Sequence, residues 1–560
     1  MPRETTRWAR MFGLLAVLAL LVPAAAIGVG AQAEGKVLRV HHITYPDDFD
    51  PQKSSFTNEI DILALAYEGL TRLGENQETI PAAAESWEYN ADATQITFTL
   101  REGLQYSDGS PLTAENFRYA VLRTCDPNTA GEYQSILFEI VGCADYAGLL
   151  GSDPSTPVAV SEDDLQAARE AVGVTAVDER TLQIDLLNSA PYYHTVAYMW
   201  VFYPAKAEMI EGDPDNWWQD PANHIGNGPF TITGIEEDQL ITFEANENYW
   251  QGRPLLDGIE YVYQGESAVA LEAYNAGDLH TVDLDPSQIP QIQADPELSD
   301  EYLAYPTASS YNLAFNLTQE PFTDIKVREA FSYAFDRETY CATIRNGDCT
   351  PTTSWIPEGI PGAIETDQFG FDPEAAVTAL AESSYGGPEG LPPISLYYNS
   401  NDSAATPRVE WIAGQYRDIL GIEITLEPTE GTTLVDLRKS PETFPQMLVV
   451  GGWIQDYPDP QNWLSVYWKC DAQFALRFGY CNEEFDELVT QADQLTNQDE
   501  RIPLYEQAGQ ILVDDVPGPF LYNLSSTFLV KPSVTGYTPS ASDVEWPGLY
   551  GSIMTLDITE

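Results

Sequence analysis

The chain has 560 residues, 43% of them hydrophobic, which is enough for more than one hydrophobic core, because single cores stop growing near about 250–300 residues. It holds 87 Asp and Glu residues against 26 Lys and Arg, a formal net charge of −61. Such a surface repels nucleic acid and anionic lipid headgroups, which excludes both as partners. A strongly solvated surface explains this charge, and attraction of cationic ligands is a second, compatible explanation.

The N-terminal segment has the three parts of an export signal. A basic start is followed by the apolar run Met11–Ala26, and Ala31-Gln32-Ala33 fits a small-x-small cleavage site. We therefore predict a signal peptide at residues 1–33 and an exported protein, in the periplasm or at the outer face of the membrane. A transmembrane anchor is the alternative. No Cys lies near the segment, so anchoring through a lipidated N-terminal Cys is not expected.

The segment Thr97–Phe117 is the most informative of the chain. Alternation over Ile96–Leu100 predicts a strand with one buried face. Asp108-Gly109 then predicts a tight turn. Thr113 is placed to cap the next helix, with Glu115 in the first turn, where the helix dipole favours an anion.

This segment, together with two blocks before it, resembles the signature of family 5 extracellular solute-binding proteins, the peptide-binding receptors of ABC importers. The two preceding blocks are Tyr67–Leu70 and Pro81–Glu88, at the spacing of the family. The resemblance implies an α/β fold with two lobes that clamp a ligand between them. The first lobe of the family is enlarged by an extra subdomain, expected here at about residues 61–191.

The six cysteines form three pairs that are close in sequence. An even number in an exported chain favours disulfides, and loop closure favours nearest neighbours. A zinc site is the alternative, but no pair has CxxC spacing and no His is close. The predicted disulfides are Cys125–Cys143, Cys341–Cys349 and Cys470–Cys481.

Blocks similar to those of the family continue through the chain, including Ile225–Phe230 with its two glycines. In Pro321–Arg337, Asp324 can cap a helix with one apolar stripe. In the family, the chain crosses here into the second lobe, and a return crossing is expected near Val516–Tyr522. The expected domains are the first lobe (34–308), the second lobe (309–519) and a return to the first lobe (520–560). The apolar stripe consists of Val327, Ala330, Phe331, Ala334 and Phe335.

The best candidate for a site is Met447–Pro460. Its continuous apolar start predicts a strand buried on both faces, and two glycines allow another backbone to approach. A carboxylate at the end of such a strand is costly unless it is paired. In peptide-binding members of the family, the Asp that matches Asp456 pairs with the α-ammonium group of the ligand. Alternatively, Asp456 only caps the following turn.

A peptide in the cleft would add as an extra strand, hydrogen-bonded to edges of both lobes. The predicted edges are Ile43–Pro46, which includes Tyr45, and Gly452-Trp453-Ile454 with the adjoining Gln455. Trp453 is equally compatible with a place in the core. Dipeptide-selective members carry an Arg where this chain has Tyr398-Asn399, so longer peptides, or ligands without a carboxylate, are favoured here.

Functions other than peptide capture are also compatible with the sequence. Some relatives in the family bind oligosaccharides or metal chelates, and a ligand-sensing domain would use the same physics. A secreted hydrolase is disfavoured, because G-x-S-x-G and H-E-x-x-H are absent and acidic pairs such as Asp283/Asp285 and Asp456/Asp459 arise by chance in so acidic a chain. The adjacent His41 and His42 should face opposite ways on a strand, so no metal site is expected there. We expect a monomer without enzymatic activity or cofactor that delivers its ligand to ABC permease subunits.

Overall fold

The computed structural model describes residues 35–151, 158–401 and 405–559, and Lys36–Glu560 form one compact unit. The expected signal peptide, residues 1–33, lies outside the described residues. Within the described ranges, no helix combines the length and the apolar character needed to cross a bilayer.

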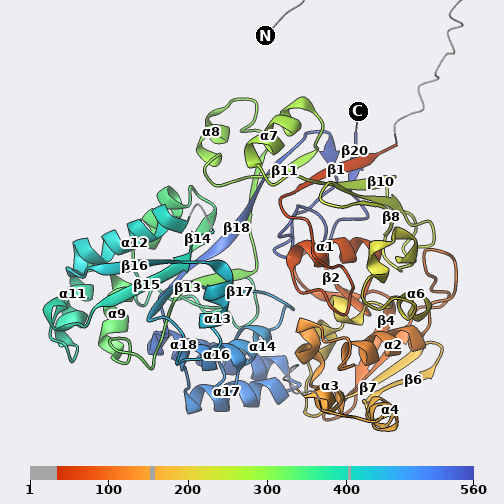
Figure 1. The fold of residues 1–560 in the computed structure, drawn as a ribbon, viewed down its shortest axis with the longest axis horizontal. Coiled ribbons are helices and arrows are strands. Elements are labelled where there is room, and N and C mark those ends of the chain that lie inside the picture. The colour runs from red at the N-terminus through yellow and green to blue at the C-terminus, as the bar shows by residue number, and fades with distance from the viewer. Residues whose placement is uncertain (1–34, 152–157, 402–404, 560) are drawn as a thin grey trace, which may run out of the picture. The chain divides into compact units, whose positions relative to one another are not determined.

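Twelve strands form one mixed sheet, and the long strand β18 (Phe520–Val530) joins its two halves. The first half of β18 pairs with β13 (Ser309–Phe315) and β14 (Cys349–Pro351). The second half pairs with β11 (Thr281–Asp283) and β12 (Tyr302–Pro306). Figure 1 shows β18 as the long blue strand between β11 and β13. The strand therefore belongs to both halves of the sheet.

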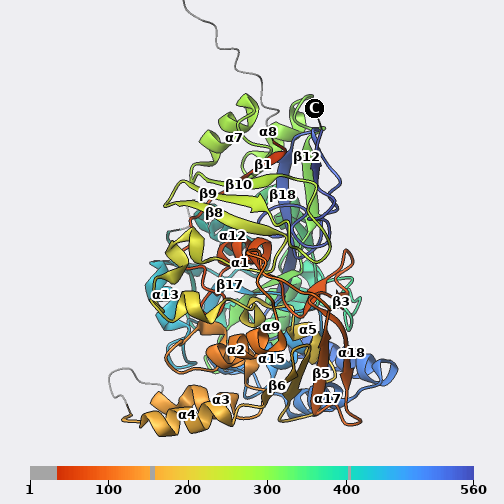
Figure 2. The same ribbon diagram turned by 90° about the vertical axis from the view of Figure 1, so that its right-hand side faces the viewer.

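The first half of the sheet is built from the N-terminal part of the chain. Strand β1 pairs in parallel with β10 and β11, whereas β10, β9 and β8 are antiparallel and lie side by side in Figure 2. Apolar side chains of β1 and α1, such as Leu38 and Ile62, are fully buried in its core. The elements are β1 (Val37–His42), β10 (Gly258–Tyr263), β9 (Leu240–Ala245), β8 (Phe230–Glu236), α1 (Thr57–Ala66), α7 (Ser267–Ala276) and α8 (Ile289–Ala294).

A separate antiparallel sheet carries the motif at residues 97–117. The predicted strand is β5, whose Ile96, Phe98 and Leu100 are buried, and the predicted helix is α2. At its start, Asn116 Oδ1 accepts a hydrogen bond from Thr113 N at 2.8 Å, which completes the cap. The strand order is β4-β5-β7-β6. The elements are β4 (Ala84–Tyr89), β5 (Gln95–Leu100), β7 (Thr181–Asp185), β6 (Val174–Asp178), α2 (Ala114–Thr124), α3 (Cys143–Ala147) and α4 (Glu162–Glu170).

The second half of the sheet has the order β16-β15-β17-β13-β18 and is covered by helices. The predicted helix after Asp324 is α9, and the Asp324 carboxylate accepts a hydrogen bond from Lys326 N at 2.9 Å. All five residues of the predicted stripe are fully buried, although the helix already ends at Tyr333. The elements are β15 (Ile394–Asn399), β16 (Ile424–Thr429), β17 (Met447–Ile454), α9 (Ile325–Tyr333), α11 (Pro373–Glu382), α12 (Ala405–Leu420), α17 (Glu483–Gln494) and α18 (Gln498–Asp515).

Disulfides join the three predicted pairs: Cys125–Cys143, Cys341–Cys349 and Cys470–Cys481. The first links the end of α2 to the start of α3. The remaining elements are short: β2 (Thr71–Leu73), β3 (Thr79–Pro81), β19 (Val534–Thr535), β20 (Asp557–Ile558), α5 (Tyr193–Val196), α6 (Ala207–Ile210), α10 (Arg337–Thr339), α13 (Gly431–Leu437), α14 (Pro460–Trp463), α15 (Ser465–Trp468) and α16 (Gln473–Phe478).

The block Ile225–Phe230 needs its first glycine because of a close backbone contact. A Cβ atom on Gly226 would lie 1.9 Å from the carbonyl oxygen of Ala66 at the end of α1. We expect Gly226→Ala to lower the free energy of unfolding by about 1–3 kcal/mol, because backbone must move to relieve the overlap. Urea denaturation measures this. The control is Gly212→Ala, where a Cβ meets nothing within 4 Å; equal stability of the two variants would contradict the explanation.

Candidate ligand-binding site

A cavity of about 260 Å³ lies between the two halves of the large sheet, and we call it the Asp456 cavity. Three carboxylates line it, those of Asp61, Asp456 and Glu545. Among the described residues that line it, none is Lys, Arg or His. Its aromatic walls are Phe56, Tyr133, Tyr198, Trp200 and Tyr550, and its other lining residues include Ala308, Ile454 and Gln455.

Asp456 follows the end of β17 and is held by groups from both sides of the cavity. Its Oδ1 accepts a hydrogen bond from Tyr133 Oη at 3.0 Å, and its Oδ2 accepts one from Asn462 Nδ2 at 2.9 Å. The hydroxyl of Tyr198 donates to its backbone carbonyl. Tyr133 and Tyr198 come from the N-terminal part of the chain, so Asp456 stands where the two sides of the cavity meet.

The Asp456 carboxylate has no charged counterpart within the described part of the chain. It is 7% exposed, and none of the ion pairs found among the described residues involves it. Burial raises its pKa to about 6, although the hydrogen bonds of Asn462 and Tyr133 lower it. A desolvated carboxylate in this state is a strong acceptor for a cation that enters the cavity.

Of the three predicted site residues Gly452, Ile454 and Gln455, two line the Asp456 cavity and one does not. Ile454 and Gln455 line the Asp456 cavity, and Gln455 N donates to Ala308 O at 2.9 Å. Gly452 does not line it. A Cβ on Gly452 would lie 2.7 Å from a ring carbon of Tyr311 on β13, so this glycine permits close strand packing.

Trp453 does not line the Asp456 cavity either. Its ring packs against Tyr467 at 5.3 Å and Phe474 at 4.9 Å between ring centroids. Its indole Nε1 donates to Asn462 Oδ1 at 2.9 Å, the same oxygen that accepts from Asp456 N at 3.0 Å. Trp453 is therefore a partly buried residue packed against the core, and it orients Asn462 and through it the Asp456 carboxylate.

Tyr45 lines a second cavity of about 630 Å³, the Tyr45 cavity. The ring of Tyr45 packs edge-on against Tyr263 at 4.9 Å. Phe56, Thr57, Val544 and Glu545 line both cavities, which therefore adjoin. The Tyr45 cavity is also lined by His41, His42, Ile43, Thr44, Asp47, Asp283, Arg345 and Asp348.

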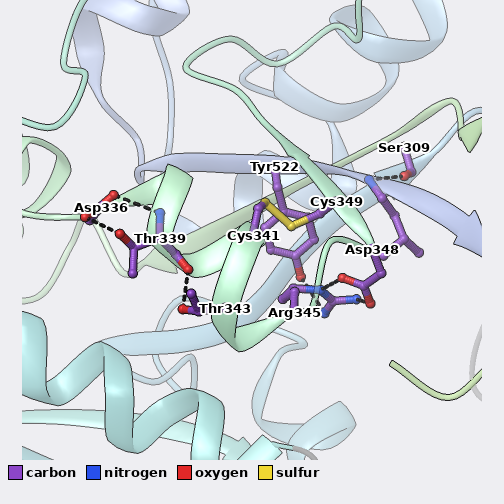
Figure 3. The surroundings of a disulfide bond; sticks show 10 residues. Ser309, Asp336, Thr339, Cys341, Thr343, Arg345, Asp348, Cys349 and Tyr522 are labelled. Atoms are coloured by element: carbon purple, nitrogen blue, oxygen red, sulfur yellow. Dashed lines mark hydrogen bonds and ion pairs between the residues drawn. A yellow bond between two sulfur atoms is a disulfide. The ribbon is translucent and has the colours of Figure 1, made fainter. Parts of the chain in front are cut away.

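The disulfide Cys341–Cys349 closes a loop that carries Arg345 and Asp348 (Figure 3). Both of these residues line the Tyr45 cavity. Arg345 binds both carboxylate oxygens of Asp348, at 2.6 and 2.7 Å, and lies over the ring of Tyr522 on β18. The charge of Arg345 is thus balanced within its own loop.

Tyr398 and Asn399 border neither cavity. Tyr398 is buried in the core, and Asn399 Oδ1 accepts a hydrogen bond from Asn401 N at 2.9 Å. The strand register explains this. Tyr397 on β15 pairs with Leu448 near the start of β17, so β15 ends beside the middle of β17, whereas Asp456 follows the end of β17.

The two adjacent histidines face different partners. His41 Nε2 lies 2.8 Å from Gln264 O, and His42 Nε2 lies 3.6 Å from Asp61 Oδ2. Within the part of the chain that the structure describes, no group of three or more His, Cys, Asp or Glu residues is arranged to hold a metal ion.

Sequence reasoning missed Tyr133, Tyr198, Asn462, Asp61 and Glu545 as members of the site. Tyr133 is 323 residues from Asp456, and nothing in the local sequence marks that contact. For Asn462 a signal does exist, because it lies six residues after Asp456. A polar side chain so close to a buried carboxylate is a natural hydrogen-bond partner.

Comparisons with known proteins agree with this architecture. The chain is 25% identical to the oligopeptide-binding protein OppA of Bacillus subtilis, over 97% of this chain and 99% of that protein. It is 28% identical to the probable deoxycholate-binding periplasmic protein YgiS of Escherichia coli, over 90% and 91%. The unliganded open form of the periplasmic murein tripeptide-binding protein MppA superposes with a TM-score of 0.76 at 24% identity, covering 94% of this chain and 98% of that one.

The fold is therefore the mixed α/β, two-lobe clamp of the periplasmic binding proteins. The sequence pattern of the bacterial extracellular solute-binding proteins, family 5 Middle, matches residues 78–475, which is more than half of the chain. The chain belongs to the bacterial extracellular solute-binding proteins of family 5.

Proposed function

We propose that this protein captures oligopeptides outside the cytoplasm and delivers them to the permease subunits of an ABC importer. The observation that carries the proposal is the buried, uncompensated carboxylate of Asp456 in a cavity without a cationic side chain among its described lining residues. The α-ammonium group of a peptide is the complementary charge. The name of the relative OppA, an oligopeptide-binding protein, supports the same ligand class.

The peptide adds as a strand beside β17. On one side, Gly452 and Ile454 pair with β13. On the other side, β15 pairs with β17 only at Met447 and Leu448 among the described residues. The backbone that leads to Asp456 therefore has a free edge for main-chain hydrogen bonds. The segment with Tyr45, beyond the end of β1, provides the opposing edge for longer peptides.

Two passages of chain connect the lobes and serve as the hinge. One lies between β12 and β13, at residues 306–309, and the other lies within β18 near Ser525. Because β18 pairs with β14 up to Leu524 and with β12 from Ser525, we propose lobes of residues 34–308 with 525–560 and of residues 309–524, in place of the boundary at 519/520 expected from the sequence; the extra subdomain stays at about 61–191. A ligand that contacts both lobes shifts the population toward the closed form, which the permease then recognises.

The proposed activity is binding without catalysis, by a monomer without a cofactor. The relatives are named as binding proteins. Of the acidic pair Asp456/Asp459, Asp459 is unsuited to acid–base chemistry, because both of its oxygens are bound to Arg501, at 2.6 and 2.7 Å. Export agrees with the sequence of residues 1–33.

A non-peptide solute is the alternative, since the relative YgiS is named as a probable deoxycholate-binding protein. Deoxycholate carries a carboxylate. The three carboxylates that line the Asp456 cavity would repel it, so the charge of the cavity favours the peptide.

Native mass spectrometry of the purified protein, followed by denaturing release, tests the proposal. We expect a ladder of short peptides. Peptides of the released sequences should rebind, and their N-acetylated forms should bind at least about 30-fold more weakly, because acetylation removes the ammonium charge. Release of a sugar, a bile acid or a metal chelate would overturn the peptide assignment. Equal binding of acetylated peptides would overturn the role of Asp456.

A further inference from the structure

Asp61, on α1, is a second buried carboxylate of the Asp456 cavity. It is 2% exposed, and neither of its oxygens accepts a hydrogen bond with good geometry from another described residue. Its nearest cationic group is His42, whose Nε2 lies 3.6 Å from Oδ2. Burial and the charge of Glu545 raise the pKa of Asp61 to about 7, although His42 and the nearby polar groups of Tyr261 and Trp546 lower it. Such a group is costly in the free protein and gains a partner if a cation binds.

The surroundings of Asp61 add more negative charge. The Glu545 carboxylate lies 3.8 Å from His42 Nδ1 and lines both cavities. Burial raises the pKa of Asp283 to about 7, and Glu545 adds to that effect. Three carboxylates therefore surround one imidazole. Even with His42 protonated, their ionised forms leave an excess of negative charge.

Aromatic rings line the Asp456 cavity beside its carboxylates, as the binding of a long cationic side chain requires. Tyr198, Trp200 and Tyr133 lie beside the carboxylates, and the rings of Tyr133 and Trp200 are 4.9 Å apart. Aromatic faces attract ammonium and guanidinium groups and cover the methylene stem of Lys or Arg. With a neutral ligand side chain, Asp61 would keep His42 as its nearest cationic neighbour among the described residues and would gain no second partner.

We propose that the Asp61 end of the Asp456 cavity binds the cationic side chain of a lysine or arginine in the first two residues of the peptide, so that the protein selects basic peptides. This rests on the proposed function, in which the α-ammonium group of the same peptide binds Asp456. One cavity then neutralises two positive charges of a single ligand, one at Asp456 and one between Asp61 and Glu545.

Isothermal titration calorimetry with pentapeptides tests the proposal. Alanine-based peptides carry lysine or its uncharged isostere norleucine at position 1, 2 or 5, in buffer of physiological ionic strength. We expect lysine at position 1 or 2 to bind at least about tenfold more tightly than norleucine there, and no such preference at position 5. Asp61→Asn should remove most of the preference and leave the affinity for the norleucine peptides within about threefold.

Two further variants separate local from general effects. Glu545→Gln should also reduce the preference for lysine, and it tests the site independently of the folding of Asp61→Asn. Glu102→Gln removes one charge at an exposed position that lines neither cavity and should leave the preference intact. Equal affinities of the lysine and norleucine peptides overturn this proposal alone. Absence of binding by every peptide overturns it together with the proposed function.

Discussion

Asp456→Asn is expected to weaken the binding of peptides with a free amino terminus while stabilising the protein without ligand. The loss of a desolvated charge pair costs about 2–5 kcal/mol, which is at least about 30-fold in affinity. The geometry of the site tolerates the change. The new amide can accept from Asn462 Nδ2 and donate to Tyr133 Oη, the two groups that now bind the carboxylate.

The gain in stability depends on pH. The pKa of Asp456 is about 6 in the folded protein, above its ordinary value of 3.8, so the folded state holds the proton more tightly than the unfolded chain does. Ionised Asp456 therefore destabilises the fold above about pH 6, and the cost disappears as the pH falls through 6 toward 4. We expect Asp456→Asn to raise the free energy of unfolding by up to about 3 kcal/mol at pH 8 and to change it little at pH 4.

Urea denaturation at both pH values, with ligand removed, measures this effect. Asp543→Asn is the matched control, because burial also raises the pKa of Asp543 to about 6. Its carboxylate accepts hydrogen bonds from the backbone N–H groups of Ser540, Gly548 and Tyr550, and an amide cannot replace all three. That variant should lose stability. If Asp456→Asn destabilised the protein at pH 8, the Asp456 carboxylate would stabilise the fold, which contradicts a carboxylate kept at a cost to stability for binding a ligand.

Asp459→Asn is expected to cost about 3–5 kcal/mol of stability, because it removes the charge that balances a buried guanidinium. Arg501 is 1% exposed and binds both oxygens of Asp459. Tyr505 lies against the same guanidinium, with its hydroxyl 2.9 Å from Arg501 Nη2. The neutral Asn would leave the buried guanidinium of Arg501 without the carboxylate that binds it.

Two further variants test whether the loss of the buried ion pair causes this loss of stability. Asp436→Asn breaks an ion pair with Lys439 whose side chains are 70% and 69% exposed, and we expect a change of at most about 1 kcal/mol. The double variant Asp459→Leu with Arg501→Met removes both charges and should recover part of the lost stability. Equal midpoints of urea unfolding for Asp459→Asn and the wild type would contradict this account of the pair.

Secondary-structure elements and disulfides between residues close in sequence could be predicted from the sequence. The alternation at 96–100, the cap at Asp324 and the three disulfides each depend on residues fewer than 20 positions apart. Within such distances, strand pleating, helix periodicity and loop closure restrict the backbone strongly. For the same reason, Asp456 could be located after a strand, in a chain whose family blocks were recognisable; of that strand, β17, the start is buried, whereas Ile454 at its end is 39% exposed.

The tertiary structure decided which side chains meet at the cavity. Tyr133 reaches Asp456 across 323 residues, and Glu545 lies beside His42 because the end of the chain returns to α1 and β1. It also placed Trp453 against the core and outside the Asp456 cavity, and the pair Tyr398-Asn399 outside both cavities. Such contacts follow from how whole strands and lobes pack. The sequence therefore determined the elements and the family, whereas the electrostatics of the cavity, and with them the choice of ligand, arose only when distant segments came together.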